Sequence, residues 1–196
     1  MLYVMLLAHL LGDYLFQWGF IARWKARALA GMLAHGGIVT LTTLVCAAAV
    51  APSWWPYALL IGLTHTLVDL VRAQLLRPKH AGWELVGYLG DQMIHLVVII
   101  LVVTWSNAGS WANLTGTLRL LGDRRVLFYT LGYVLLLNPA WVLLRFVVRG
   151  VWGRYASPIL EEGEKYGPMV ERVLIATCVL TGRFHLVPLV LLPRRL

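Results

Sequence analysis

The stretch DQMIH, residues 91–95, lies inside an apolar segment that runs from about residue 85 to residue 105. A carboxylate, an amide and an imidazole are costly to place in such a segment, and ionisable groups at membrane depth usually serve a function. Two other apolar segments carry groups of the same kind, namely His9, Asp13 and Gln17 in the first and His65 and Asp69 in the third. We therefore interpret the chain as a set of helices that assembles one buried polar site.

The composition is typical of an integral membrane protein. Hydrophobic residues make up 60% of the 196-residue chain and charged residues only 13%, whereas soluble domains are close to half apolar and a quarter charged. Each crossing takes about 20 apolar residues, so we predict a single all-α domain over residues 1–196, a polytopic transmembrane helix bundle with five to six spans. The expected spans are about 2–21, 29–51, 57–75, 85–105 and 126–148, followed by a broken apolar stretch over 167–192.

The basic residues predict how the chain is oriented. The formal net charge is +8, and the basic residues are concentrated in the linkers after the first, third and fifth expected spans. Cytoplasmic loops of membrane proteins carry such an excess. We therefore expect a protein of the bacterial inner (cytoplasmic) membrane with its N-terminus outside. The expected partner is the lipid bilayer, and we expect no nucleic acid.

The order of the polar residues predicts that they meet at one depth. Residues four apart share one helix face, so His65 and Asp69 form one polar stripe and Asp91 and His95 another. His precedes Asp in the first and third segments, and Asp precedes His in the fourth, which runs in the opposite direction. The Asp is then nearer the cytoplasm in every case, so we expect the site in the cytoplasmic half of the bundle.

The residue types in this site suit a divalent transition metal. Charges in a bilayer must pair or bind an ion, and imidazole with carboxylate suits zinc foremost, with manganese or iron as alternatives. We expect one or two ions. The candidate ligands are His9, Asp13, His35, His65, Asp69, Asp91 and His95. Asp13 and Asp91 are also the candidate catalytic residues, since a carboxylate beside a metal can act as general base.

Three other polar residues have simpler interpretations. We expect Gln17 and Gln92 to hydrogen-bond to the ligands or between helices. We expect Arg72 to extend its charged end to the lipid headgroups rather than to enter the site.

Together these motifs resemble an uncharacterised bacterial multi-pass inner-membrane family, a domain of unknown function. The resemblance rests on HLLGDYLFQ at 9–17, Lys25, His35, H-x3-D at 65–69, D-Q-x2-H at 91–95 and GPMVER at 167–172. It implies that Glu171, in the late G-x3-E-R motif, is a further catalytic candidate, and it implies a Lys where this chain has Arg72. More distantly, the layout is similar to that of membrane-bound metal-dependent hydrolases, an analogy of fold and site rather than of reaction.

Three functions fit these observations. The expected one is a membrane-embedded metal-dependent enzyme, a hydrolase acting on a lipid or amphipathic substrate. The first alternative is a metal-ion or proton-coupled transporter, although the outer halves of the first four expected spans hold few polar groups, which favours a one-sided pocket. The second alternative is a structural membrane protein whose polar groups hold the helices together.

Overall fold

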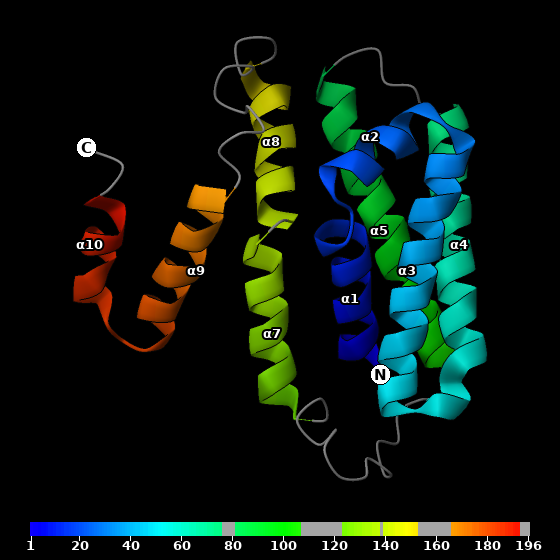
Figure 1. Cartoon of the computed structure of the whole chain (residues 1–196), viewed down its shortest axis with the longest axis horizontal. Helices are drawn as coiled ribbons and strands as arrows, with labels where there is room; N and C mark the ends of the chain where they lie inside the picture. Colours follow the sequence, from blue (N-terminus) through cyan, green and yellow to red (C-terminus); the bar gives the residue numbers. More distant parts are fainter. Residues whose placement is uncertain (76–80, 107–122, 138, 153–165, 193–196) are drawn as a thin grey trace.

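The computed structural model describes residues 1–75, 81–106, 123–137, 139–152 and 166–192, and every regular element in these ranges is helical (Figure 1). The basic linkers after the third and fifth expected spans lie largely outside the described residues. The main elements are α1 (Leu2–Leu10), the π-helical turn η1 (Leu11–Leu15), α2 (Gly19–Arg27), α3 (Leu29–Val50), α4 (Trp55–Leu75), α5 (Ala81–Trp105), α7 (Arg124–Leu137), α8 (Pro139–Trp152), α9 (Tyr166–Leu180) and α10 (Val187–Leu191).

Helices α1, α3, α4 and α5 form one bundle in which α3, α4 and α5 alternate in direction (Figure 1). The closest partners in it are α3 and α4, and α2 folds back against α3. Helices α7 and α8 follow one another along the side formed by α1 and α5, and α9 and α10 make a V beyond α7. The expected broken stretch over 167–192 is thus two short helices, which reverse direction at Gly182 with φ 71°.

The bundle has a polar interior around the expected site, an apolar core beside it that includes Met5 and Ile99, and an apolar outer surface. Apart from Tyr14 and Tyr88, the buried titratable side chains of the described residues are imidazoles or carboxylates of the expected site: His9, Asp13, His35, His65, Asp69, Asp91 and His95. Large apolar side chains cover the outward faces, and Leu41, Leu63 and Leu101 are each more than half exposed, at 63%, 57% and 60%. Buried ionisable groups together with large exposed apolar surfaces are unusual in soluble proteins. The all-α prediction is confirmed, and the outer surface matches an apolar surrounding.

The number of helices able to cross a membrane is lower than predicted. Within the described residues, two helices are long and apolar enough, namely α3 and the part of α5 over Glu84–Trp105. The number rises to four if two bent pairs, α1–η1 with α2 and α7 with α8, each count as one span. Five to six spans are therefore not confirmed. Helix α4 has 21 residues, but His65, Asp69 and Arg72 make it less apolar than its neighbours.

The first expected span, over residues 2–21, is broken in the structure. The turn η1 ends at Leu15, and α2 leaves it at 83°. Gln17 consequently lies in the bend instead of continuing the helical stripe of His9 and Asp13. Helix α2 is less apolar than α1 and carries three cations: Arg23, Lys25 and Arg27.

A second break lies at Pro139, between α7 and α8, which are bent by 42°. Proline has no N–H to donate and its ring disrupts the preceding turn. Arg172 of α9 compensates for this break, because its Nε donates to the Leu136 carbonyl and its Nη2 to the Leu137 carbonyl, each at 2.8 Å. The guanidinium thus satisfies carbonyls at the end of α7 and ties α9 to the bend.

Candidate metal centre

Helices α3 and α4 bring His35 and His65 together, with their Nε2 atoms 3.4 Å apart. The residues beside them permit this approach, since a methyl group added at Gly36 would overlap the side chain of Thr66. Small residues allow close contact between helices, as is common for helices packed within membranes. The two imidazoles therefore meet because α3 has a glycine, Gly36, at the point where it contacts α4.

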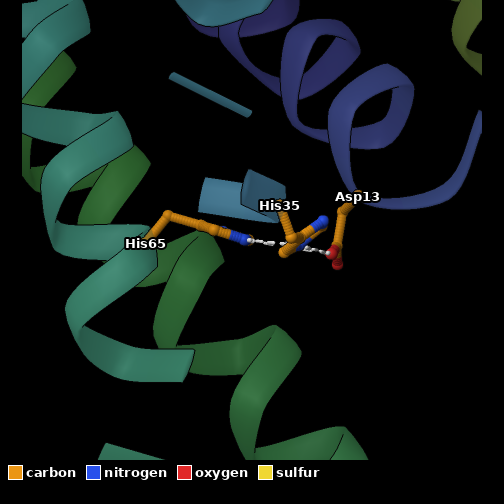
Figure 2. Close-up of side chains that lie close together, drawn as sticks. All are labelled: Asp13, His35 and His65. Atoms are coloured by element: carbon orange, nitrogen blue, oxygen red, sulfur yellow. Dashed lines mark hydrogen bonds and ion pairs between the residues drawn. The ribbon is translucent and has the colours of Figure 1, made fainter. Parts of the chain in front are cut away.

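Asp13 reaches the two histidines from η1. Turns of π-helix are rare and are found frequently at functional sites. Asp13 Oδ1 lies 3.1 Å from His35 Nε2 and 3.8 Å from His65 Nε2. Figure 2 shows Asp13 and His65 on either side of His35. Gly12 brings the turn close to α3, because an added methyl group there would lie only 3.1 Å from the Cα of Val39.

Asp69, one turn after His65 on α4, completes a set of four donor atoms. Its Oδ2 lies 3.4 Å from His65 Nε2 and 3.5 Å from His35 Nε2. The two Nε2 atoms are thus 3.4 Å apart, and each lies 3.1 to 3.8 Å from a carboxylate oxygen of Asp13 and of Asp69. A tetrahedral zinc site with bonds of about 2.0–2.1 Å places its ligand atoms about 3.3–3.4 Å apart. These five separations are therefore close to those between the ligands of a tetrahedral metal site, and the donor atoms of Asp13, His35 and His65 all lie within 4.8 Å of one another.

A second group of possible ligands adjoins the first. The His95 ring stacks on the His65 ring with centroids 4.0 Å apart, and His65, Asp69 and His95 also lie within metal-binding reach of one another. His95 Nε2 and Asp91 Oδ1 are 3.6 Å apart, and both are buried without a hydrogen-bond partner among the described residues. The two groups share His65, and together their residues offer ligands for one ion or for two neighbouring ions.

Gln92 connects α1, η1 and α5 beside these groups. His9 Nε2 donates to Gln92 Oε1 at 3.2 Å, and Gln92 Nε2 donates to Asp13 at 3.1 Å and to Asp91 at 3.4 Å. The hydrogen-bonding role expected of Gln92 is confirmed. His9 lies in the cluster, with its ring centroid 5.5 Å from that of His65, but it belongs to neither ligand group.

The cluster also contains two cations that were not expected there, Lys25 and Arg72. Lys25 Nζ lies 2.7 Å from Asp69 Oδ2, and Arg72 Nη1 donates to Asp91 Oδ2 at 2.9 Å. The expectation that Arg72 extends to the headgroups is wrong, because its guanidinium forms an ion pair with Asp91 on the neighbouring helix α5. Lys25 arrives because α2 folds back over the bundle, which the apolar pattern of the first segment did not reveal.

The carboxylates form the floor of an open cavity of about 740 Å³. Asp13, Asp69 and Asp91 line it, while His35 and His65 lie in the interior and are 0% and 3% exposed. The walls come from η1, α2, α3, α4, α5 and α8. A ligand in this cavity would thus meet the carboxylate side of the four donor atoms.

Glu171 lies apart from the cluster. It is on α9, which packs against α7 and α10, and it is not among the residues that line the cavity. The structure therefore does not bring this catalytic candidate to the other site residues. In the same motif, it is the neighbouring Arg172 that has a visible role, at the break between α7 and α8.

Comparison with protein families matches residues 1–121 to a model described as a protein of unknown function, DUF3307. The chain belongs to this family. The expected membership of an uncharacterised family is confirmed, and the matched residues include every ligand candidate from His9 to His95. No curated protein and no solved structure matches the DUF3307 chain.

Proposed function

We propose that this DUF3307 protein is a membrane-embedded, metal-dependent hydrolase that acts on a lipid or amphipathic substrate. One observation carries the proposal: carboxylate oxygens of Asp13 and Asp69, which line an open cavity, lie at metal-ligand spacing from the buried imidazoles of His35 and His65. Two imidazoles with two carboxylates suit zinc, and also manganese or iron. The adjoining group with His95 allows for a second ion.

The outer surface supports the membrane part of the proposal. We propose that α4 crosses together with α3 and α5, because its outward residues Leu63 and Leu67 are exposed and apolar while its polar residues face the bundle. The cavity opens at the end of the bundle that carries Lys25 and Arg149. By the positive-inside rule this end faces the cytoplasm, which gives an inner-membrane protein with the N-terminus outside.

In this proposal a metal held at the cluster and the carboxylate of Asp91 have different roles in hydrolysis. A bound divalent metal supplies Lewis-acid activation of water. Asp91 lines the cavity and has an Oδ1 atom without a hydrogen-bond partner among the described residues, so it serves as general base. The hydroxyl of the water joins the electrophilic atom of the ester, the bond to the leaving oxygen breaks, and Asp91 passes the proton to that oxygen.

The two ion pairs favour a second candidate, a purely structural site. Lys25 and Arg72 each neutralise one carboxylate of the floor, and such pairs can satisfy charges in a membrane interior without any metal. A structural site predicts that no metal copurifies with the protein.

Elemental analysis of the detergent-purified protein separates the two candidates. We expect one or two equivalents of metal in the wild type and none in His35→Ala or His65→Ala, because each replacement removes a nitrogen ligand. His185→Ala is the matched control, since this exposed histidine lies on the turn between α9 and α10. Absence of metal from folded wild-type protein after incubation with zinc or manganese would refute the metal centre.

A further inference from the structure

Helix α8 presents one stripe of side chains to the cavity. Trp141, Arg145 and Arg149 all line it, and residues four apart share one helix face. Leu144 and Val151 on other faces of α8 are 48% and 65% exposed. A helix whose outward side is apolar thus directs two guanidinium groups toward the space above the carboxylate floor.

These two arginines differ from the other cations of the cavity. Lys25 and Arg72 each pair with a carboxylate of the floor, but Arg145 and Arg149 have no ion-pair partner in the part of the chain that the structure describes. The Nε of Arg145 is moreover buried without a hydrogen-bond partner there. Since a buried polar atom without a partner is unfavourable, the cavity has positive charge available for an anionic ligand.

The rest of the upper wall is aromatic. The rings of Tyr88 and Phe146 stack with centroids 4.6 Å apart, which holds α8 against α5. The hydroxyl groups of Tyr14 and Tyr88 hydrogen-bond to each other at 2.6 Å, leaving their rings along the cavity. A ligand that fills the cavity therefore contacts both guanidinium groups and an apolar surface.

We propose that Arg145 and Arg149 bind a phosphate group, and that the ligand of this cavity is a phosphate-bearing amphiphile. A carboxylate has two oxygens, which a single arginine can occupy in a bidentate pair, whereas a phosphate has enough acceptor oxygens for two arginines. The inference rests on the proposed function in one respect, that the phosphate-bearing molecule is the substrate of the metal centre. Phosphate binding by the two arginines does not itself require the metal.

Calorimetric titration of the full chain in a phosphate-free detergent tests this inference. The ligands are a short-chain phosphatidic acid, inorganic phosphate, and the diacylglycerol of the same chain length as a neutral control. The variants are Arg145→Gln with Arg149→Gln, the corresponding double Lys variant, and Arg183→Gln as a control for loss of charge at an exposed position. Each is titrated with and without zinc, and its metal content and thermal unfolding are measured in parallel.

We expect phosphatidic acid to bind more tightly than diacylglycerol, and the double Gln variant to lose affinity by about tenfold or more per arginine, as for charge-assisted hydrogen bonds. The Lys variant should retain part of the affinity and Arg183→Gln all of it. Equal binding of inorganic phosphate would identify a free phosphate as the ligand, and weaker binding would identify the lipid headgroup; both support the phosphate site.

Unchanged affinity in a folded double Gln variant would overturn the inference, as would equal affinity of the wild type for phosphatidic acid and diacylglycerol. The metal measurement keeps the two proposals separate. Metal present with no phosphate binding would reject the phosphate site and leave the metal centre. Phosphate binding that depends on the arginines, in a protein without metal, would reject the hydrolase and leave the phosphate site.

Discussion

The helices up to α5 and the helix α8 contribute to the cavity in different ways. The donor atoms of the candidate metal centre lie on η1, α3, α4 and α5, within the family-matched residues. Helix α8 lies beyond the match and contributes arginines and aromatic rings to the wall. The comparison suggests that the reactive chemistry and the recognition of the ligand are separate properties, which substitutions should affect independently.

The largest effect should come from Lys25→Met, which tests whether the floor is a metal centre or a salt-bridge cluster. The change leaves Asp69 buried without its partner, and breaking such a pair costs about 3–5 kcal/mol. We expect the metal-free variant to unfold at markedly lower temperature. We also expect zinc to restore most of that loss, because the metal replaces the ammonium as the partner of the carboxylate.

Thermal unfolding with and without zinc measures this effect. Lys25→Arg serves as the control that keeps the charge. If zinc leaves the unfolding temperature of Lys25→Met unchanged, the pair is structural and the metal centre is wrong.

Gly36→Ala should have the next largest effect on metal content, because the added methyl group overlaps Thr66 and forces α3 away from α4. Overpacking of this kind costs about 1–3 kcal/mol, and the separation of His35 from His65 should reduce metal content as well. Gly37→Ala is a matched control in the same helix, since an added methyl group there meets nothing within 4 Å. Equal metal content in the two variants would show that the close helix contact does not position the ligands.

Arg172→Met tests the contribution of α8, because Arg172 fixes the break between α7 and α8. It removes the hydrogen bonds to the carbonyls of Leu136 and Leu137, and bonds that involve a charged group contribute about 1.5–3 kcal/mol each at most. We expect α8 to lose its fixed position, so that phosphatidic acid binds more weakly while metal content stays at the wild-type value. A parallel loss of metal would mean that the two regions are not separable.

The smallest effect should come from Tyr14→Phe, which removes one partner of the Tyr14–Tyr88 hydrogen bond. A neutral hydrogen bond of this kind contributes about 0.5–1.5 kcal/mol. We expect a slight fall in the unfolding temperature with metal content and phosphate affinity preserved. Tyr3→Phe on the exposed face of α1 is the control, and an effect of the same size there would show that the hydrogen bond contributes nothing.

The candidate ligands could be predicted from the sequence because their signal is local. His65 with Asp69, and Asp91 with His95, are four residues apart, and one helix turn suffices to place each pair on one face. Their opposite order in α4 and α5 matches the opposite directions of these helices in the structure. Neither inference requires knowledge of the loops.

The cations and the break before α2 could not be predicted in the same way. Lys25 approaches Asp69 only because the chain turns by 83° before α2, and the apolar residues up to Ile21 mask that turn. The spacing of Arg145 and Arg149 places them on one face of a helix, but only the packing of α8 against α5 shows that this face lines the cavity. The family resemblance implied that Glu171 belongs to the site, but the structure places this residue on α9, away from the cluster.

The turn η1 constrains how this part of the chain can change in length. A π-helical turn holds more residues than an α-helical turn, so its hydrogen bond from the Phe16 N–H reaches back five positions to the Leu11 carbonyl. Successive residues in an α-helix are rotated by about 100°. Deleting one residue between His9 and Asp13 would therefore swing the imidazole about a quarter turn away from Gln92. We expect relatives that keep both residues to show no insertion or deletion between them, even where the surrounding sequence has diverged.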